Sequence, residues 1–132
     1  MIDILQELEI FSGYDKSELV ILKKYFKLKK YNAGEPVIKP GEIIKELFIV
    51  VSGKILSMLK LPGSIDRKHI EHIRGDAFGV LSIFGDKPSF DSYTASEMSE
   101  LLVIEEKDFL ELIEAVPGCS IKLISNLLSH TI

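Results

Sequence analysis

The chain has 132 residues, of which 46% are hydrophobic and 27% are charged, a composition typical of a single soluble globular domain. Its 16 Lys and Arg residues against 20 Asp and Glu residues give a net charge of -4, so we expect no direct binding to nucleic acid. No stretch approaches the roughly 18 apolar residues of a membrane span and the first residues show no signal peptide, so we expect a cytoplasmic protein with no membrane contact.

The first 25 residues have the apolar spacing of helices. Ile2, Leu5 and Leu8 recur at helical intervals, and the pattern breaks at residues 12–13, which are Ser and Gly. Either Asp15 or Ser17 is positioned to cap a second helix after this break. We therefore predict a helical lead-in over residues 1–25.

Residues 26–104 have the pattern of an all-β domain. Short apolar runs alternate with segments rich in Gly, Pro, Asn and Ser, at residues 32–36, 39–42, 52–53, 61–64 and 74–75. Turn signals at such short and regular intervals favour an antiparallel sandwich or barrel over alternating strands and helices.

Two apolar runs in this region predict a buried hairpin. Residues 46–52 are almost continuously apolar, and residues 54–61 follow them after a Ser-Gly turn. Residues 66–74 predict a half-exposed strand that places His69 and His72 on opposite faces, because side chains alternate along a strand. The two histidines are therefore not expected to bind a metal together.

The segment from Gly75 to Ala95 is the most informative part of the sequence. Gly75 and Gly79 precede a short apolar run at residues 80–84, which is too brief for an ordinary helix and fits a single helical turn. The first N–H groups of such a turn are unpaired and capture anions, and the glycines before it let a ligand approach the backbone.

The C-terminal part of the chain returns to a helical pattern. Residues 92–97 and 99–104 predict two strands, and residues 107–115 predict a helix that stops at residues 117–118, which are Pro and Gly. A last helix is predicted at residues 121–131, so that residues 105–132 form C-terminal helices. The single cysteine, Cys119, excludes an internal disulfide and is interpreted as a packed helix residue.

The segment from Gly75 to Ala95 resembles the phosphate-binding cassette of the cyclic nucleotide-binding domain family, the sensory domain of cyclic AMP receptor proteins and kinase regulatory subunits. The family pattern is Phe-Gly-Glu-Leu-Ala, six residues, and Arg-x-Ala-Thr/Ser-Val-x-Ala, usually with Pro before the Arg. The matching residues are Phe78, Gly79, Leu81, Pro88, Ser92 and Ala95. The strand at residues 46–52 and the glycines at positions 34, 41 and 53 also match the family.

The resemblance implies a mainly β fold, a double-stranded β-helix jelly roll over residues 26–104. N-terminal helices, a short cassette helix and C-terminal helices flank it in a single domain of residues 1–132, of a bacterial type. The ligand-binding residues that it implies are Phe78, Gly79, Val80, Leu81, Ser82, Ser89, Phe90 and Ser92.

Three positions depart from the family pattern. Val80 replaces the Glu that holds the ribose hydroxyl, Ser89 replaces the Arg that pairs with the cyclic phosphate, and Asp91 replaces a small Ala. We therefore expect weak or no binding of cyclic AMP and cyclic GMP and no cofactor, although Lys87, Arg74 or Lys68 could partly replace the Arg. Two hypotheses stay open, a sensor of a different small ligand and an interaction module with a vestigial pocket.

Catalysis is not expected from this sequence. The chain has no His-x-His pair of the kind that metal-dependent jelly-roll enzymes use, and no recognisable nucleophile arrangement. The domain is instead expected to act through a partner protein. The apolar stripe of the last helix, Ile121, Ile124 and Leu128, predicts a homodimer through residues 118–131.

Overall fold

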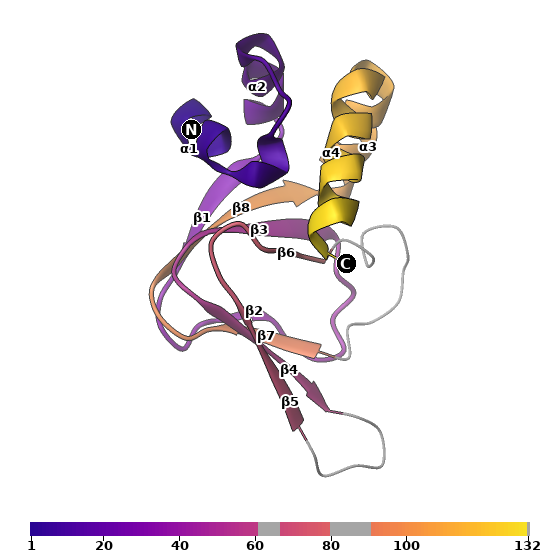
Figure 1. Ribbon diagram of the computed structural model, residues 1–132. Coiled ribbons are helices and arrows are strands. Elements are labelled where there is room, and N and C mark those ends of the chain that lie inside the picture. The colour runs from indigo at the N-terminus through magenta and orange to yellow at the C-terminus, as the bar shows by residue number, and fades with distance from the viewer. Residues whose placement is uncertain (61–66, 80–90, 132) are drawn as a thin grey trace.

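Two four-stranded antiparallel sheets face each other, and the helices cover the outer face of one of them (Figure 1). This is a computed structural model, and it describes residues 1–60, 67–79 and 91–131. Sheet A has the strand order β1 (Lys27–Tyr31), β8 (Ser99–Glu105), β3 (Glu46–Ser52) and β6 (Ala77–Phe78). Sheet B has the order β2 (Pro36–Ile38), β7 (Asp91–Ala95), β4 (Ile55–Lys60) and β5 (Arg67–His72). The prediction of a mainly β, antiparallel domain is confirmed.

The helices come from the two ends of the chain and lie together above sheet A (Figure 1). They are α1 (Ile2–Glu7), the 3-10 turn η1 (Glu9–Phe11), α2 (Lys16–Lys23), α3 (Glu106–Ala115) and α4 (Pro117–Thr131). Asp15 caps α2, because its Oδ1 accepts the Glu18 N–H at 2.9 Å while Glu18 Oε1 accepts the Asp15 N–H at 3.1 Å. Of the two predicted caps, Asp15 is therefore the one used. No helix in the described ranges is long and apolar enough to cross a membrane.

The buried residues form two cores on either side of sheet A. Leu47, Ile49 and Leu102 point from its outer face toward the helices, where they join one core. Phe48 and Val103 point from its inner face toward sheet B, where they join the other. Strands β3 and β8 are therefore buried on both faces, which explains why their sequences are nearly continuous apolar runs.

The predicted hairpin between residues 46–52 and 54–61 is wrong. Strand β3 lies between β8 and β6 in sheet A, so both of its edges are already paired. Strand β4 pairs with β5 and β7 in sheet B, so the Ser-Gly turn carries the chain from one sheet to the other. The predicted cassette helix at residues 80–84 lies outside the described residues.

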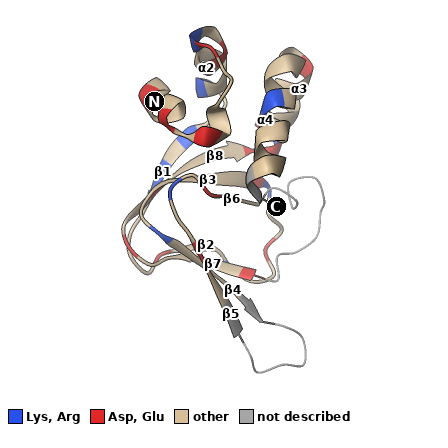
Figure 2. Ribbon diagram, in the orientation of Figure 1, with Lys and Arg blue, Asp and Glu red and all other residues tan. Residues whose placement is uncertain are grey.

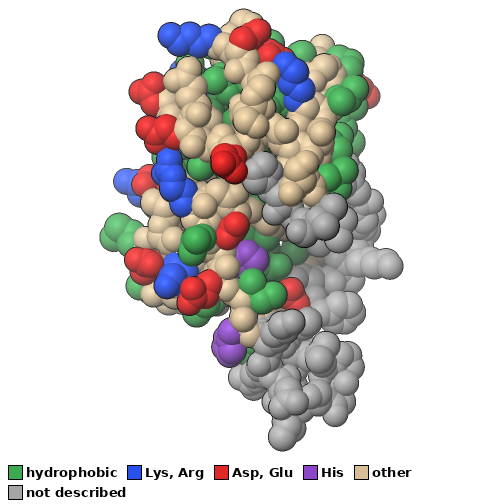
Figure 3. Space-filling view, viewed as in Figure 1, with side chains coloured by type: hydrophobic (Ala, Val, Ile, Leu, Met, Phe, Trp, Pro, Cys, Tyr) green, Lys and Arg blue, Asp and Glu red, His purple; other side chains and the backbone are tan. Residues whose placement is uncertain are grey.

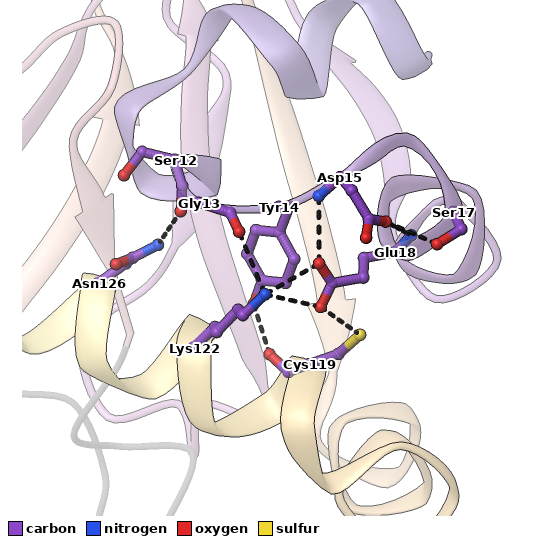
Figure 4. Close-up of polar contacts among 9 residues, drawn as sticks. All are labelled: Ser12, Gly13, Tyr14, Asp15, Ser17, Glu18, Cys119, Lys122 and Asn126. Carbon is purple, nitrogen blue, oxygen red and sulfur yellow. Dashed lines mark hydrogen bonds and ion pairs between the residues drawn. The ribbon is translucent and has the colours of Figure 1, made fainter.

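Polar contacts join the N-terminal helices to α4 (Figure 4). Lys122 binds the carboxylate of Glu18, and the side-chain amide of Asn126 donates to the carbonyl oxygens of Ile10 and Ser12. The hydroxyl of Tyr14 donates to the carbonyl oxygen of Cys119. These contacts tie the two ends of the described chain into one helical layer.

Charged residues of both signs are spread over the helices and strands (Figure 2). Several are paired across elements, such as Lys29 of β1 with Glu46 of β3 at 3.1 Å and Lys45 with Glu106 of α3 at 3.5 Å.

Candidate functional site

The inner face of sheet B carries a group of polar and aromatic side chains. Directly opposed residues of antiparallel strands share a face, and the pairing places Ser57 of β4 opposite Tyr93 of β7. Asp91 is two positions before Tyr93 and so lies on the same face, opposite Leu59. From β5, His72 reaches the same face, where its Nε2 is 3.0 Å from the hydroxyl oxygen of Ser57.

Three aromatic rings stack across the space between the sheets. The rings of Phe48 and Phe78 in sheet A are 4.9 Å apart and inclined by 11°, and the rings of Phe78 and Tyr93 are 4.6 Å apart and inclined by 9°. The imidazole of His72 packs at the side of this column, 5.4 Å from Phe78 and 5.6 Å from Tyr93. We call Phe48, Phe78, Tyr93, His72 and Asp91 the inner cluster. It connects the two sheets by stacked rings.

Two groups of the inner cluster, the phenol of Tyr93 and the imidazole of His72, have shifted pKa values. Burial, together with the negative charge of Asp91 and its hydrogen bond from the phenol, raises the pKa of Tyr93 to about 12. Burial lowers the pKa of His72, although the carboxylates of Asp76 and Asp91 act in the opposite direction. At neutral pH the phenol of Tyr93 and the imidazole of His72 are therefore both neutral.

A tight turn places Phe78 in the column. Asp76 accepts the N–H of Ile73 at 2.8 Å, and the guanidinium of Arg74 donates to the carbonyl oxygen of Val51 at 3.0 Å, which fixes the turn against β3. Strand β6 stops at Phe78 because the next residue, Gly79, has φ +85°. A Cβ at that position would lie 2.6 Å from the carbonyl oxygen of Glu46, so only glycine fits.

The structure describes three of the eight ligand-binding residues that the resemblance implies. Phe78 is 4% exposed and belongs to the inner cluster, and Gly79 follows it directly. Ser92 is opposite Met58, on the face of sheet B that points away from Tyr93, so it is not brought together with Phe78. The other five residues, Val80, Leu81, Ser82, Ser89 and Phe90, lie outside the described residues.

Of the three replacement cations considered from the sequence, the structure describes the side chain of Arg74. Arg74 binds Glu7 at 2.9 Å in addition to the carbonyl oxygen of Val51. Lys68 is in β5 opposite Leu59, but its side chain lies outside the described part of the chain, as does Lys87. On the inner face of sheet A, Lys27 and Lys29 are paired with Glu105 and Glu46.

Sequence reasoning missed Tyr93, His72 and Phe48 as members of one cluster. The sequence signal that could have placed Tyr93 was the alternation of side-chain direction along the strand at residues 91–95. This alternation puts Asp91, Tyr93 and the fully buried Ala95 on one face. This alternation shows that Ser92 faces the other way. It does not show which rings of sheet A meet Tyr93, because that depends on how the two sheets pack.

The sequence profile of the family described as "Cyclic nucleotide-binding domain" matches residues 28–116, a span that contains both sheets except for Lys27, the first residue of β1. The chain belongs to the cyclic nucleotide-binding domain family. Members of this family are regulatory and sensory domains, and the resemblance inferred from the sequence is confirmed.

Relatives with known names support this membership. The chain is 29% identical to the "Cyclic AMP receptor protein" of Thermus thermophilus over 108 residues, which cover 82% of this chain and 50% of that protein. It is 33% identical to a "CRP-like cAMP-activated global transcriptional regulator" of Mycobacterium tuberculosis, over 71% of this chain and 42% of that protein. The chain thus spans about half the length of these relatives or less.

A solved cyclic nucleotide-binding domain from Methylobacillus flagellatus superposes with a TM-score of 0.84 over 97% of this chain and 72% of that one, at 17% identity. This similarity supports the same jelly-roll fold.

Chemically, the inner cluster offers a ring surface, a carboxylate acceptor and an imidazole. No group of three or more His, Cys, Asp or Glu residues in the described ranges is placed to hold a metal ion.

Proposed function

We propose that this cyclic nucleotide-binding domain is a non-enzymatic regulatory module of a cytoplasmic protein that binds cyclic AMP and cyclic GMP weakly or not at all. The observation that supports this most directly is the position of Asp91. Its carboxylate shares the inner face of sheet B with Tyr93, where the family pattern has a small Ala. A carboxylate on this face repels a cyclic phosphate, whose charge has the same sign.

The two other departures from the family pattern act in the same direction. Ser89 stands in place of the Arg that pairs with the cyclic phosphate, and Val80 in place of the Glu that holds the ribose. Hydrogen bonds to charged groups contribute roughly 1.5 to 3 kcal/mol each, and a bidentate Arg makes two. Its loss alone weakens binding by several hundred-fold or more, at about 1.4 kcal/mol per tenfold.

The described cations considered as replacements for the missing Arg are held by other contacts. Arg74 is held by Glu7 and by the backbone, and releasing it would break both contacts. Lys29, which lies on the inner face of sheet A, is paired with Glu46. We therefore expect the dissociation constants of both nucleotides to be roughly millimolar or weaker.

Isothermal titration calorimetry with cyclic AMP and cyclic GMP tests this proposal. A micromolar dissociation constant for either nucleotide would contradict it. The triple variant Val80→Glu, Ser89→Arg, Asp91→Ala restores the family pattern and should gain binding that the three single variants lack, because Arg alone would be drawn to Asp91. The matched control carries Ser92→Arg in place of Ser89→Arg, and it should not gain binding because Ser92 faces away from the cluster.

We further propose that the domain acts through a partner, and that a second copy of the chain binds along α4. Leu123 and Leu127 of this helix are buried against the domain, whereas Ile121 is 65% exposed and Leu128 is 49% exposed. Leu110 of α3 is also exposed, and hydrophobic side chains line the edge of the molecule formed by α3 and α4 (Figure 3). A two-fold contact would bury this apolar face in both copies.

Analytical ultracentrifugation distinguishes a dimer from a monomer. We expect a dimer at ~100 μM, at which even micromolar self-association is complete. The double variant Ile121→Glu, Leu128→Glu should be monomeric, whereas Ser129→Glu, on the polar side of the same helix, should leave the dimer intact. A monomeric parent protein would overturn the assembly proposal without affecting the proposal on nucleotide binding.

A further inference from the structure

The edge strands of the two sheets differ in how well they are protected against pairing with another strand. Strands β2 and β6 have only three and two residues, and β2 also carries Pro36 and a register shift between Pro36 and Ile38. Three of the five residues of β1 are lysines, at positions 27, 29 and 30. Short length, proline, irregular register and lysine are the usual features that keep an edge from adding a further strand.

Strand β5 has the longest and most regular of these edges. Its six residues pair with six residues of β4 without a register shift, and it contains neither Pro nor Gly. Its basic residues stand at its beginning, at positions 67 and 68, and residues 69–72 are His, Ile, Glu and His. In the described ranges β5 pairs with β4 alone, because it is the last strand of sheet B.

The backbone of β5 is therefore available on its free side. Alternate residues of an antiparallel strand direct their N–H and C=O groups toward the neighbouring strand, and the residues between them direct these groups away from it. At the free side of β5 this gives a row of donors and acceptors along the strand. The chemical group that complements such a row best is another extended backbone.

Ile70 adds an apolar contact at this edge. It is 46% exposed, whereas Ser57, which lies directly opposite it in β4, is 3% exposed. The inner face of sheet B is thus closed at β4 and open at β5. An apolar side chain at the same level of an added strand would cover Ile70, as cross-strand pairs do within a sheet.

Glu71 determines the charge that fits on the other face. Its side chain is 60% exposed, and its carboxylate is 3.7 Å from the ammonium nitrogen of Lys54, which precedes β4. A carboxylate has about four acceptor positions, so a Lys or Arg of an added strand can bind Glu71 from the free side while Lys54 stays in place. An acidic residue directly opposite Glu71 would be destabilising.

We propose that the free edge of β5 binds an extended segment of a partner protein as a fifth, antiparallel strand of sheet B, with an apolar residue beside Ile70 and a Lys or Arg beside Glu71. Strands β4 and β5 extend away from the helices (Figure 1), so this edge and α4 are separate surfaces. The inference rests on the proposed function, in which the domain acts through a partner, and it names where that partner binds.

A synthetic peptide tests whether the edge adds a strand. The probe is acetyl-Thr-Val-Lys-Val-Thr-Val-Thr-amide, in which the valines share one face and the Lys lies on the other. We expect the peptide to slow amide hydrogen exchange in β5, because the free backbone groups of this strand become paired. An unchanged exchange rate in β5 at saturating peptide would overturn the inference.

N-methylated peptides show whether the backbone makes the contact. One version carries N-methyl groups on the three valines, and the other carries them on the three residues that follow the valines. Only one edge of the peptide can face β5 when the valines lie beside Ile70, so one version should bind like the parent peptide. The other should bind at least about tenfold more weakly, because it loses several backbone hydrogen bonds. Equal affinities of the two versions would contradict strand addition.

Variants of the domain test the two side chains. Ile70→Lys should weaken peptide binding at least about tenfold, whereas Val20→Lys, at a position of α2 that is 44% exposed, should leave it unchanged. Glu71→Lys should weaken binding of the Lys peptide and strengthen binding of the same peptide with Glu in place of Lys. This gain cannot result from a loss of folding, and its absence would overturn the assigned charge.

Sedimentation of the Ile121→Glu, Leu128→Glu variant distinguishes a partner segment from a second copy of the chain at this edge. If that variant still self-associates and the addition of Ile70→Lys makes it monomeric, the edge binds another copy and the inference is wrong. A monomer before the addition supports a partner segment. Micromolar binding of cyclic AMP would contradict the proposed function but would leave the peptide measurements unaffected, so the two failures can be told apart.

Discussion

The ammonium nitrogen of Lys122 in α4 lies 2.9 Å from each carboxylate oxygen of Glu18 in α2, although the two residues are 104 positions apart in the sequence. The same nitrogen also donates to the carbonyl oxygen of Gly13 at 3.1 Å. The hydrogen bond from Lys122 lowers the pKa of Glu18, which keeps the carboxylate charged in mildly acidic solution. The position of α4 is therefore set by the N-terminal helices as well as by the core beneath it.

Asn126 should contribute more to this connection than an exposed ion pair does, because its amide donates to two backbone carbonyl oxygens, those of Ile10 at 2.7 Å and Ser12 at 3.0 Å. We expect Asn126→Ala to lower the free energy of unfolding by about 1 to 2 kcal/mol. Urea denaturation measures this. Ser129→Ala is the matched control, since the hydroxyl of Ser129 donates to the carbonyl oxygen of Ser125 in its own helix. Equal losses in the two variants would mean that Asn126 contributes nothing specific.

Gly53, at the crossing between the two sheets, should tolerate no side chain. It has φ +84°, and a Cβ would lie 2.2 Å from the hydroxyl oxygen of Ser99 and 2.5 Å from the carbonyl oxygen of Met98. Gly41 has a similar φ of +88° but open space around it. We expect Gly41→Ala to cost about 1 to 2 kcal/mol for the left-handed backbone alone. Gly53→Ala should cost at least about 2 kcal/mol more in the same denaturation assay, because the backbone must also shift.

His72 should make the domain sensitive to mild acid. Burial lowers its pKa in the folded state, so its contribution to stability is present above the unfolded value of about 6.5 and is lost as the pH falls through the folded value. We expect the free energy of unfolding to fall as the pH drops below about 6.5. His72→Gln keeps a partner for Ser57 and should remove this decline, whereas His69→Gln, at an exposed position of the same strand, should retain it. If the free energy of unfolding depended on pH in the same way in His72→Gln and in the parent protein, the decline could not be attributed to His72.

The phenol of Tyr93 should ionise only at high pH. Burial and Asp91 raise its pKa to about 12, so the neutral phenol is favoured in the folded state and its contribution is lost as the pH rises from about 10 to 12. Asp91→Asn should bring the pKa of Tyr93 closer to its ordinary value, as followed by NMR of ¹³C-labelled tyrosine. Asp76→Asn removes a carboxylate that does not act on Tyr93 and should leave its titration unchanged. A pKa that stays near 12 in Asp91→Asn would assign the whole shift to burial.

Much of the fold could be predicted from local patterns. The lead-in helices, a cap at Asp15 or Ser17, most of the strands and the C-terminal helices follow from apolar spacing and turn residues, because these depend on residues close in sequence. The pairing of β3 could not be predicted in this way. A strand followed by Ser-Gly and another strand has the pattern of a hairpin. In the structure β8 and β6 occupy both edges of β3, so the next strand pairs in the other sheet instead.

The candidate site was predictable only in part. The match to the family identified Phe78 and Gly79 from their motif, and Asp91 as a departure from it. Tyr93 and His72 belong to no motif, and they meet Phe78 only because the two sheets pack face to face. Which face of β7 points inward could be predicted from its alternation, but the ring that it meets could not.

The pairing of β3 with β8 affects how the protein can be made. A ribosome adds Glu46–Ser52 before Ser99–Glu105, so until β8 has been made one edge of β3 lacks its partner and its apolar side chains remain uncovered. Sheet B draws its strands only from residues 36–95, so it can be completed first. The nascent chain therefore carries an exposed apolar strand until β8 emerges, and this interval is when it is most open to aggregation and to capture by chaperones.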